Sequence, residues 1–358
     1  MNVLAIVPDL RAPSCRFRVR QYLEPLKSEG IVLEIAGLGR PGRERRRLFE
    51  RARDFDAALV HRKLLNYFDF RRLRRSARRL IYDFDDAVMF RDSNSPRRTS
   101  RVRLSSFRRM AGGSDLVIAG NEYLAAFARP LNARVHVLPT PVDLSRFPDR
   151  PAPGAGTTAG WMGTKSNFIY LGLAEEALRR LTRSRPGFVF AAISDEAVEM
   201  PGIAVVRKEW SLEDEVNDLR KFDVGIMPLF DDEWAKGKCA LKILQYFAAF
   251  LPVVCSPVGT NREVVSEGVN GFFARDPRKW EEKIKILLDS PETREKMGRA
   301  GRRLVEEKYA LSVVAPRFAV LLRGEDLPPK HEDIVISNQL SVISKSALPA
   351  SGMLRADH

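Results

Sequence analysis

Short apolar segments alternate with longer helical patterns through most of the chain, and this alternation limits the possible folds more than any other feature. In the first half, the apolar segments lie at residues 3–7, 31–38, 57–61, 80–84, 115–120 and 134–140. Short strands that alternate with helices of about 10–15 residues are typical of parallel βαβ units, in which helices cover both faces of the sheet. The pattern therefore predicts an α/β domain with a doubly wound parallel sheet.

The alternation stops at a segment rich in proline and glycine, and then begins again. Proline and glycine at this density mark a linker, here residues 151–157. New apolar segments follow at 158–163, 188–193, 203–206, 223–229, 251–256 and 270–274, and helical patterns end the second half at 277–289, 291–308 and 311–323. A chain of 358 residues is long enough to build two separate cores.

We therefore predict two Rossmann-like domains that face each other across a cleft. Ligands of such sheets bind at the carboxyl ends of the strands, so the active site is expected in this cleft. The predicted parts are an N-terminal domain at 1–150, a second domain at 158–310, a closing helix at 311–324, and a flexible or loosely docked tail at 325–358.

The excess positive charge lies entirely in the first domain. Residues 1–150 hold 31 of the 60 basic residues and 17 of the 46 acidic ones, so the remainder holds 29 of each. The arginines form three runs, at 40–53, 71–79 and 97–109. Such runs either attract a polyanion or only keep the domain soluble. We expect an anionic membrane surface and no nucleic acid, because no aromatic stacking platform or known reader motif accompanies the arginines.

The cysteines and histidines favour neither a disulfide framework nor a metal site. Three cysteines without CxxC spacing fit a reducing compartment, and none of the four histidines is spaced as a metal-binding pair. No signal peptide or apolar run of about 20 residues is evident in the sequence. We expect a cytoplasmic protein, bound peripherally at the inner face of the membrane if it meets a membrane at all.

Two lysines stand out in the segment KCALKILQYFAAFLPVVCSPVGTN, residues 238–261. Lys238 and Lys242 are four residues apart, so they share one face near the start of a predicted helix. Gln245 lies one turn further on nearly the same face, where it could bond a ribose hydroxyl. The alternative is an ordinary surface helix with two solvated lysines.

The same segment ends in a turn suited to an anion. Gly259 can adopt backbone angles that are closed to other residues. The amides of Thr260 and Asn261 are then expected to face an anion at the start of the next helix. Together with the two lysines, this turn predicts a diphosphate site.

The motifs GWMGT, DVGIMPL and KCALKILQYFAAFLPVVCSPVGTNREVVSEGVNGFF occur in this order within residues 158–310. They resemble the C-terminal domain of retaining GT-B glycosyltransferases of the glycosyl transferases group 1 family. RFRVRQYLEPLKSEGI and LIYDFDDAVMF resemble a bacterial branch of that family with a YD-x-DD element. The resemblance implies that the C-terminal domain binds a nucleotide-sugar, the N-terminal domain binds the acceptor, and transfer needs no metal or other cofactor.

The resemblance also assigns donor-site residues. Gly163 and Thr164, followed by Lys165, match the loop that meets the diphosphate, and Lys242 matches the family's lysine. The turn from Gly259 to Asn261, together with Glu263, matches a Gly-x-x-Glu turn near the phosphates and the sugar.

This chain departs from the family at three of these positions. Gln245 and Gly237 stand where the family often has glutamates, and Thr164 stands where it often has arginine. Asp231, Asp232 or Glu233 could replace the first glutamate. These departures leave the mode of ribose binding and the identity of the sugar open.

The acceptor side is predicted at the carboxyl ends of two N-terminal strands. His61 and Arg62 end one of them, and Asp83, Asp85 and Asp86 end another. His61 could orient the acceptor hydroxyl. The crowded carboxylates could hold sugar hydroxyls, act as a weak base, or pair with arginines such as Arg91. A metal-binding Asp-x-Asp of the GT-A type is disfavoured, because a second doubly wound domain follows.

The loop after the first strand carries Arg16 and Arg18 where the family usually has a glycine-rich loop. An anionic acceptor, or one embedded in an anionic membrane, would suit these side chains.

The sequence as a whole predicts a retaining glycosyltransferase that acts in cell-surface polysaccharide or glycolipid synthesis. Its donor would be a UDP-, GDP- or ADP-sugar and its acceptor a glycan or a lipid-linked sugar, with Lys242, Lys238, His61 and Asp86 as catalytic residues. The alternatives are a sugar epimerase or phosphorylase of the same fold, and a polyanion-binding protein on a degenerate scaffold.

Overall fold

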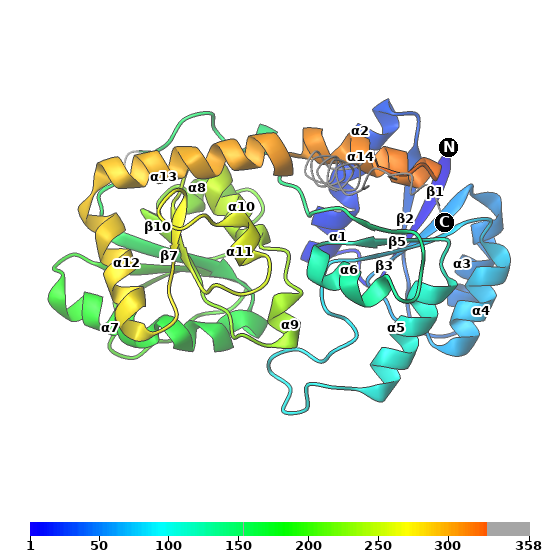
Figure 1. The fold of residues 1–358 in the computed structure, drawn as a ribbon, viewed down its shortest axis with the longest axis horizontal. Helices are drawn as coiled ribbons and strands as arrows, with labels where there is room; N and C mark the ends of the chain where they lie inside the picture. Colours follow the sequence, from blue (N-terminus) through cyan, green and yellow to red (C-terminus); the bar gives the residue numbers. More distant parts are fainter. Residues whose placement is uncertain (153, 328–358) are drawn as a thin grey trace, which may run out of the picture.

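The computed structural model describes residues 1–152 and 154–327 and contains two α/β domains side by side (Figure 1). Each domain is built on a six-stranded sheet in which all neighbouring strands are parallel. All twelve apolar segments form strands, so the predicted α/β fold with two doubly wound sheets is confirmed. Most of the predicted tail, residues 328–358, and one linker residue, Pro153, lie outside the described residues.

The N-terminal sheet has the strand order β2-β1-β3-β4-β5-β6. Its strands are β1 (Asn2–Val7), β2 (Val32–Gly37), β3 (Ala57–His61), β4 (Leu80–Phe84), β5 (Leu116–Ala119) and β6 (Val135–Val137). Its helices are α1 (Pro13–Arg18), α2 (Leu23–Ser28), α3 (Arg43–Arg51), α4 (Tyr67–Ser76), α5 (Arg101–Gly113) and α6 (Glu122–Ala128), with short 3-10 turns η1 (Arg20–Tyr22), η2 (Ala52–Asp54) and η3 (Leu144–Arg146). Separate apolar clusters fill the two faces of the sheet, as a doubly wound sheet requires.

The C-terminal sheet has the strand order β12-β11-β10-β7-β8-β9. Its strands are β7 (Thr158–Gly163), β8 (Val189–Ser194), β9 (Val205–Glu209), β10 (Val224–Met227), β11 (Val253–Cys255) and β12 (Gly271–Phe273). Its helical elements are η4 (Lys165–Leu171), α7 (Gly172–Ser184), α8 (Glu215–Leu219), α9 (Glu233–Lys236), α10 (Leu241–Ala248), α11 (Asn261–Val264), α12 (Pro277–Asp289) and α13 (Pro291–Leu304), followed by a π-helical turn, η5 (Val305–Tyr309).

The last described helix, α14 (Leu311–Arg323), packs on the N-terminal domain, although its sequence pattern follows directly from the second domain. The rings of Phe318 and Tyr22 lie 4.7 Å apart between their centroids, and Val314 and Leu322 are fully buried beside them. In Figure 1, α13 runs over the C-terminal domain and α14 continues over the other one. The chain therefore crosses between the domains twice, and its C-terminal part completes the first core.

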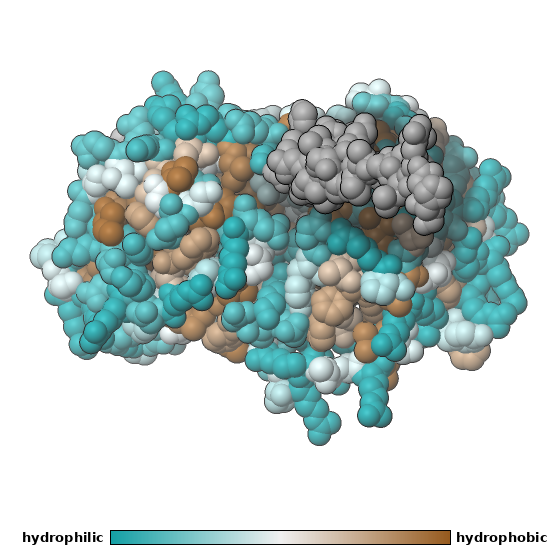
Figure 2. Space-filling model, in the orientation of Figure 1, coloured by the Kyte–Doolittle hydropathy of each residue, from teal (hydrophilic) through white to brown (hydrophobic). Residues whose placement is uncertain are grey.

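The chain order reverses direction in each sheet between two neighbouring strands, β1 and β3 in the first and β7 and β10 in the second. Ligands of open parallel sheets bind at the carboxyl ends of the strands beside such a reversal. His61 and Gly163 end β3 and β7, so the topology places both predicted halves of the site at these edges. Figure 2 shows one face of the whole molecule. Hydrophilic side chains cover most of the coloured part of this face, and several project at its lower edge.

A buried carboxylate fixes the entry from the linker into the second sheet. Asp223 is 4% exposed and accepts hydrogen bonds from the backbone amides of Gly156, Thr157 and Thr158 at 2.8–2.9 Å. The Arg294 guanidinium lies 3.7 Å away and is also buried.

We expect Asp223→Ala to lower the free energy of unfolding by about 3–5 kcal/mol, because it leaves Arg294 and three amides buried without their acceptor. Urea denaturation measures this change. Asp289→Ala is the matched control: its half-exposed carboxylate pairs with Arg185, and removing it should cost at most about 1 kcal/mol. Equal losses in the two variants would contradict the role assigned to Asp223.

Candidate active site

Lys242 reaches from the start of α10 to the carboxyl end of β7. Its Nζ lies 4.7 Å from the centroid of the Trp161 ring. A Cβ atom on residue 163 would come within 2.3 Å of the Trp161 ring and 2.6 Å of the same Nζ, so glycine leaves room for both side chains at that position. The structure therefore brings Lys242 and Gly163 together, as the sequence predicts.

Lys238 lies against a second group of side chains at the same edge. Its Nζ is 3.3 Å from Oδ1 of Asn167 and 5.6 Å from the centroid of the Tyr170 ring. Between the two lysines, Ala240 has a left-handed φ of 52° at the start of α10. Within the described residues, neither ammonium forms an ion pair with an acid.

The electrostatics of this pair are unusual for lysine. Burial and, to a smaller extent, the charge of Lys238 lower the pKa of Lys242 to about 7. Desolvation and a like charge both disfavour an ammonium. An anion placed between the two groups would remove both penalties, so the arrangement suits a diphosphate.

The turn from Gly259 to Asn261 differs from its prediction. Gly259 has a φ of 51°, and a Cβ there would come within 2.5 Å of the Lys236 carbonyl, so the need for glycine is confirmed. However, the Asn261 amide donates to the Val258 carbonyl at 3.1 Å, and its side chain donates to the Ser256 carbonyl. The predicted contact of the Asn261 amide with an anion is therefore wrong, because the turn itself uses that donor.

The other predicted donor residues are spread around the lysines. Thr164 accepts a hydrogen bond from Asn167 at 2.8 Å, and Lys165 is exposed and pairs with Glu196. Gln245 is 3% exposed and lines a cavity of about 190 Å³ with Arg16 and other residues of both domains. Glu263 lies in α11, after the Gly259 turn.

The candidate acceptor edge is built around a buried carboxylate. Asp83 lies between Nδ1 of His61, at 2.7 Å, and the guanidinium of Arg18, which reaches its other oxygen. Burial alone would raise the pKa of Asp83, but the charge of Arg18 and the hydrogen bond from His61 outweigh it and lower the pKa. Asp83 is therefore ionised, and it holds a proton on Nδ1 of His61.

Two polar atoms face each other beyond this group. Nε2 of His61 and Oδ1 of Asp85 lie 3.9 Å apart, and neither has a hydrogen-bond partner among the described residues. Burial raises the pKa of Asp85, although the charge of His61 opposes this. Buried polar groups are rarely left without partners, so this pair points to a position for a hydroxyl group or water.

The remaining acceptor-side residues are paired within the protein. Asp86 forms an ion pair of 2.7 Å with Arg62, which has a left-handed φ of 61°. Among the alternatives for the aspartates, pairing with arginine therefore holds for Asp83 and Asp86, with Arg18 and Arg62 as partners in place of Arg91.

The two arginines after β1 have different surroundings. Arg18 is 2% exposed and donates to the Leu138 carbonyl as well as to Asp83, so its predicted acceptor contact is wrong. Arg16 instead joins the domains, with Nη2 at 2.8 Å from a carboxylate oxygen of Glu215 in α8.

Sequence reasoning missed the residues that join the two edges. Ser93 accepts from the hydroxyl of Tyr170 at 2.7 Å and bonds Asp232 at 3.1 Å, and Asn94 donates to the Ser166 carbonyl. Asn121 makes a further set of contacts across the same junction. No local pattern marks these residues, because their partners lie more than 70 residues away in the chain.

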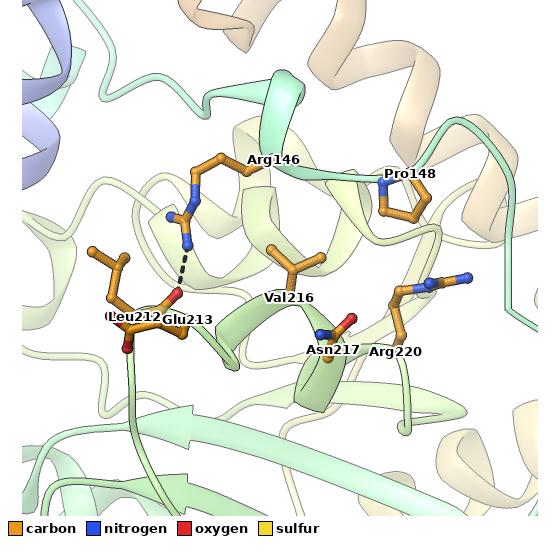
Figure 3. Close-up of a pocket in the computed structure, with 7 residues that line it drawn as sticks. All are labelled: Arg146, Pro148, Leu212, Glu213, Val216, Asn217 and Arg220. Carbon is orange, nitrogen blue, oxygen red and sulfur yellow. Dashed lines mark hydrogen bonds between the residues drawn. The ribbon is translucent and has the colours of Figure 1, made fainter.

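A surface cavity of about 460 Å³ lies between η3 and α8 (Figure 3), and it shares Arg146 and Leu212 with the cavity that Gln245 lines. Arg146 projects into it and donates to the Leu212 carbonyl at 2.8 Å. None of the predicted site residues lines this larger cavity.

Comparison with known sequences gives two matches, each to part of this chain. Residues 174–290 match the sequence model of the glycosyl transferases group 1 family. Spore coat protein SA of Bacillus subtilis (strain 168) is 41% identical over 71 residues, which are 19% of this chain and 19% of that protein.

Solved structures with similar folds cover most of the chain. Sucrose-phosphate synthase of Thermosynechococcus elongatus is 14% identical with a TM-score of 0.69, and the match covers 90% of this chain and 99% of that one. HepE of Anabaena, solved with UDP and glucose, is 13% identical with a TM-score of 0.70 and the same coverage. A glycosyltransferase of Rickettsia africae ESF-5 is 11% identical with a TM-score of 0.67, covering 89% and 97%. The family match is limited to residues 174–290, and the likeness to these solved structures shows that the chain has the fold of GT-B glycosyltransferases.

Proposed function

We propose that the protein transfers a sugar from a nucleotide diphosphate sugar to an acceptor hydroxyl, with retention of the anomeric configuration. The observation that carries this proposal is the pair of ammonium groups, Lys238 and Lys242, held without acidic partners in the described chain beside Gly163. Structures of similar fold have been solved with UDP, UDP-glucose or GlcNAc, which supports a UDP-sugar as the first donor to test.

The chemistry follows from where charge develops. When the bond between the anomeric carbon and the diphosphate breaks, the leaving group gains negative charge, and cations already in place stabilise it most strongly. Lys242 and Lys238 would supply that charge, so the proposed reaction needs no metal. A rate that depends strongly on Mn²⁺, or that EDTA abolishes, would contradict this assignment.

On the acceptor side, His61 and Asp85 are the proposed contacts of the acceptor hydroxyl. In the neutral imidazole, the proton lies on Nδ1 toward Asp83, and Nε2 can then accept a hydrogen bond from that hydroxyl. Oδ1 of Asp85 lies 3.9 Å from Nε2 of His61. Because burial raises the pKa of Asp85, this carboxyl group could either accept a hydrogen bond from the acceptor hydroxyl or donate one to it. Asp86, by contrast, would act through its ion pair with Arg62.

Calorimetry with UDP, GDP and ADP tests the donor site directly. We expect one of these nucleotides to bind the wild-type protein, and Lys242→Met to lower kcat with the matching sugar donor by about 10²–10³-fold. Lys279→Met, on the exposed face of α12, is the matched control and should change neither property. If no nucleotide binds the wild-type protein, the degenerate-scaffold interpretation replaces this proposal.

Lys242 should also make stability depend on pH in a predictable direction. Its folded pKa of about 7 lies below the value of about 10.4 for unfolded lysine, so the folded state bears the full desolvation penalty below about pH 7. The penalty fades as pH rises from about 7 to about 10, because the folded protein loses the proton first. We expect Lys242→Met to raise Tm most near pH 6 and progressively less towards pH 10, measured by scanning calorimetry. A Tm difference that does not vary with pH would show that this ammonium is well solvated.

We further propose that the N-terminal domain works at an anionic membrane, on an acceptor of cell-surface polysaccharide or glycolipid synthesis. Two exposed apolar residues, Phe68 (81%) and Val102 (77%), lie in the first turns of α4 and α5. Both helices leave the carboxyl edge of the sheet, where His61 and Asp85 lie. Exposed arginines surround them on α3, α4 and α5: Arg43, Arg46, Arg47, Arg71, Arg75, Arg101 and Arg108.

The charge on these helices is available to lipid head groups. Glu50 of α3 and Asp69 of α4 already pair with Arg72 and Arg45, and Glu44 is the one other acid of α3, so basic residues outnumber acidic ones on these helices. Basic residues near an anionic surface contribute about 1 kcal/mol each. In the described residues, no helix is long and apolar enough to cross a bilayer.

Vesicle co-sedimentation tests this surface. We expect binding to vesicles that contain anionic lipid, weakening as salt rises, and little binding to neutral vesicles. The double variant Phe68→Ser/Val102→Ser should bind less, whereas Val32→Ser, at a 56% exposed position elsewhere in the domain, should bind like wild type. Equal binding to neutral vesicles, or a preference for RNA over vesicles at matched salt, would overturn the membrane assignment.

A further inference from the structure

Asn121 occupies the junction between the acceptor edge and the lysine pair. It follows β5 at the carboxyl end of the N-terminal sheet and is 2% exposed. Its side-chain oxygen accepts a hydrogen bond from the Leu124 amide at 2.9 Å and so caps α6. This half of the side chain serves its own domain, as an N-cap asparagine commonly does.

The other half of the same side chain serves the opposite domain. The Asn121 amide nitrogen lies 3.1 Å from the Gly237 carbonyl, 3.3 Å from the Lys238 carbonyl and 3.0 Å from Oγ1 of Thr260. It has only two hydrogens for these three oxygens, so at least one hydrogen is shared. All three acceptors belong to the C-terminal domain.

These acceptors lie on the two segments that form the candidate diphosphate site. Gly237 and Lys238 lead through the left-handed Ala240 into α10, which carries Lys242. Thr260 follows Gly259 in the second segment. One amide group therefore ties both segments to the end of β5.

The surrounding backbone allows little freedom at this junction. A Cβ on Gly120 would lie 2.4 Å from Sγ of Cys239, and a Cβ on Gly237 would lie 2.8 Å from the backbone nitrogen of Ala87. Sγ of Cys239 also donates to the carbonyl of Asp85 at 3.3 Å. The hydrogen bond from Cys239 therefore joins the segment that carries the lysines to Asp85 at the acceptor edge.

We propose that Asn121 is a positioning residue, which sets the paired ammonium groups at a fixed distance from His61 and Asp85 so that the donor and acceptor meet in register. This inference rests on the proposed glycosyl transfer. Asn121 touches neither substrate; it acts through the backbone of Gly237 and Lys238 and through the hydroxyl of Thr260. A nucleotide bound to the C-terminal domain would make its own contacts without it.

Two substitutions separate the cap from the junction. Asp and Ser cap helices about as well as Asn, so Asn121→Asp and Asn121→Ser keep the bond to Leu124. Asn121→Asp replaces the donor by an acceptor, and Asn121→Ser is too short to reach the other domain. We expect both variants to lower kcat by at least about tenfold, which corresponds to the loss of one or more buried hydrogen bonds. The KM for the donor and the affinity for UDP should change by less than about threefold.

Asn132→Asp is the matched control. The Asn132 amide also donates to two carbonyl groups, those of Ala111 and Ser114, but both lie in its own domain. We expect this control to lower Tm and leave kcat unchanged. If the Asn121 variants behave like Asn132→Asp, or keep kcat within about twofold of wild type, Asn121 has only a structural role and the inference fails.

Small-angle X-ray scattering tests the junction without any assay of turnover. We expect a larger radius of gyration for both Asn121 variants than for the wild-type protein and Asn132→Asp. If wild type turns over no sugar donor, the proposed function fails on that result alone. An unchanged radius in both Asn121 variants would overturn the junction itself, whatever the enzyme's activity.

Discussion

A desolvated ammonium group beside a second one is the constraint on which the candidate site depends. Lys242 has no acidic partner within the described residues, and burial lowers its pKa to about 7. Such a group lowers the stability of the ligand-free protein, and it forms a favourable charge interaction only when an anion binds. The glycine at 163 and the left-handed residue at 240 both serve to hold it there. The cost in stability and the capacity to bind a diphosphate therefore have the same origin.

The acceptor edge distributes its charges in the opposite way. Asp83 is fully paired between Arg18 and His61, and Asp86 is paired with Arg62, so most of the charge there is neutralised inside the protein. Nε2 of His61 and Oδ1 of Asp85, by contrast, lack hydrogen-bond partners among the described residues. A reaction that removes a proton from a neutral hydroxyl needs a few well-placed acceptors and not a strong field.

The two edges are joined by contacts from distant parts of the chain. Arg16 binds Glu215, Asn121 binds the backbone before α10, and α14 returns to complete the first core. Together these contacts hold the two domains against each other. The geometry of the proposed reaction therefore depends on residues that touch no substrate.

The sequence by itself determined the twelve strands, the two-domain division, the lysine pair and the need for glycine at 259. These features follow from local periodicity and local backbone angles, which depend on only a few neighbouring residues. Only the tertiary structure decided that Arg18 neutralises Asp83, that the Asn261 amide is consumed in its turn, and that α14 packs on the first domain. Asn121 caps α6 within its own domain, and its second role exists only because folding brings residues 237, 238 and 260 to it. Which distant polar groups form hydrogen bonds or ion pairs depends on which strand ends come together in the folded protein. No local sequence pattern encodes this arrangement.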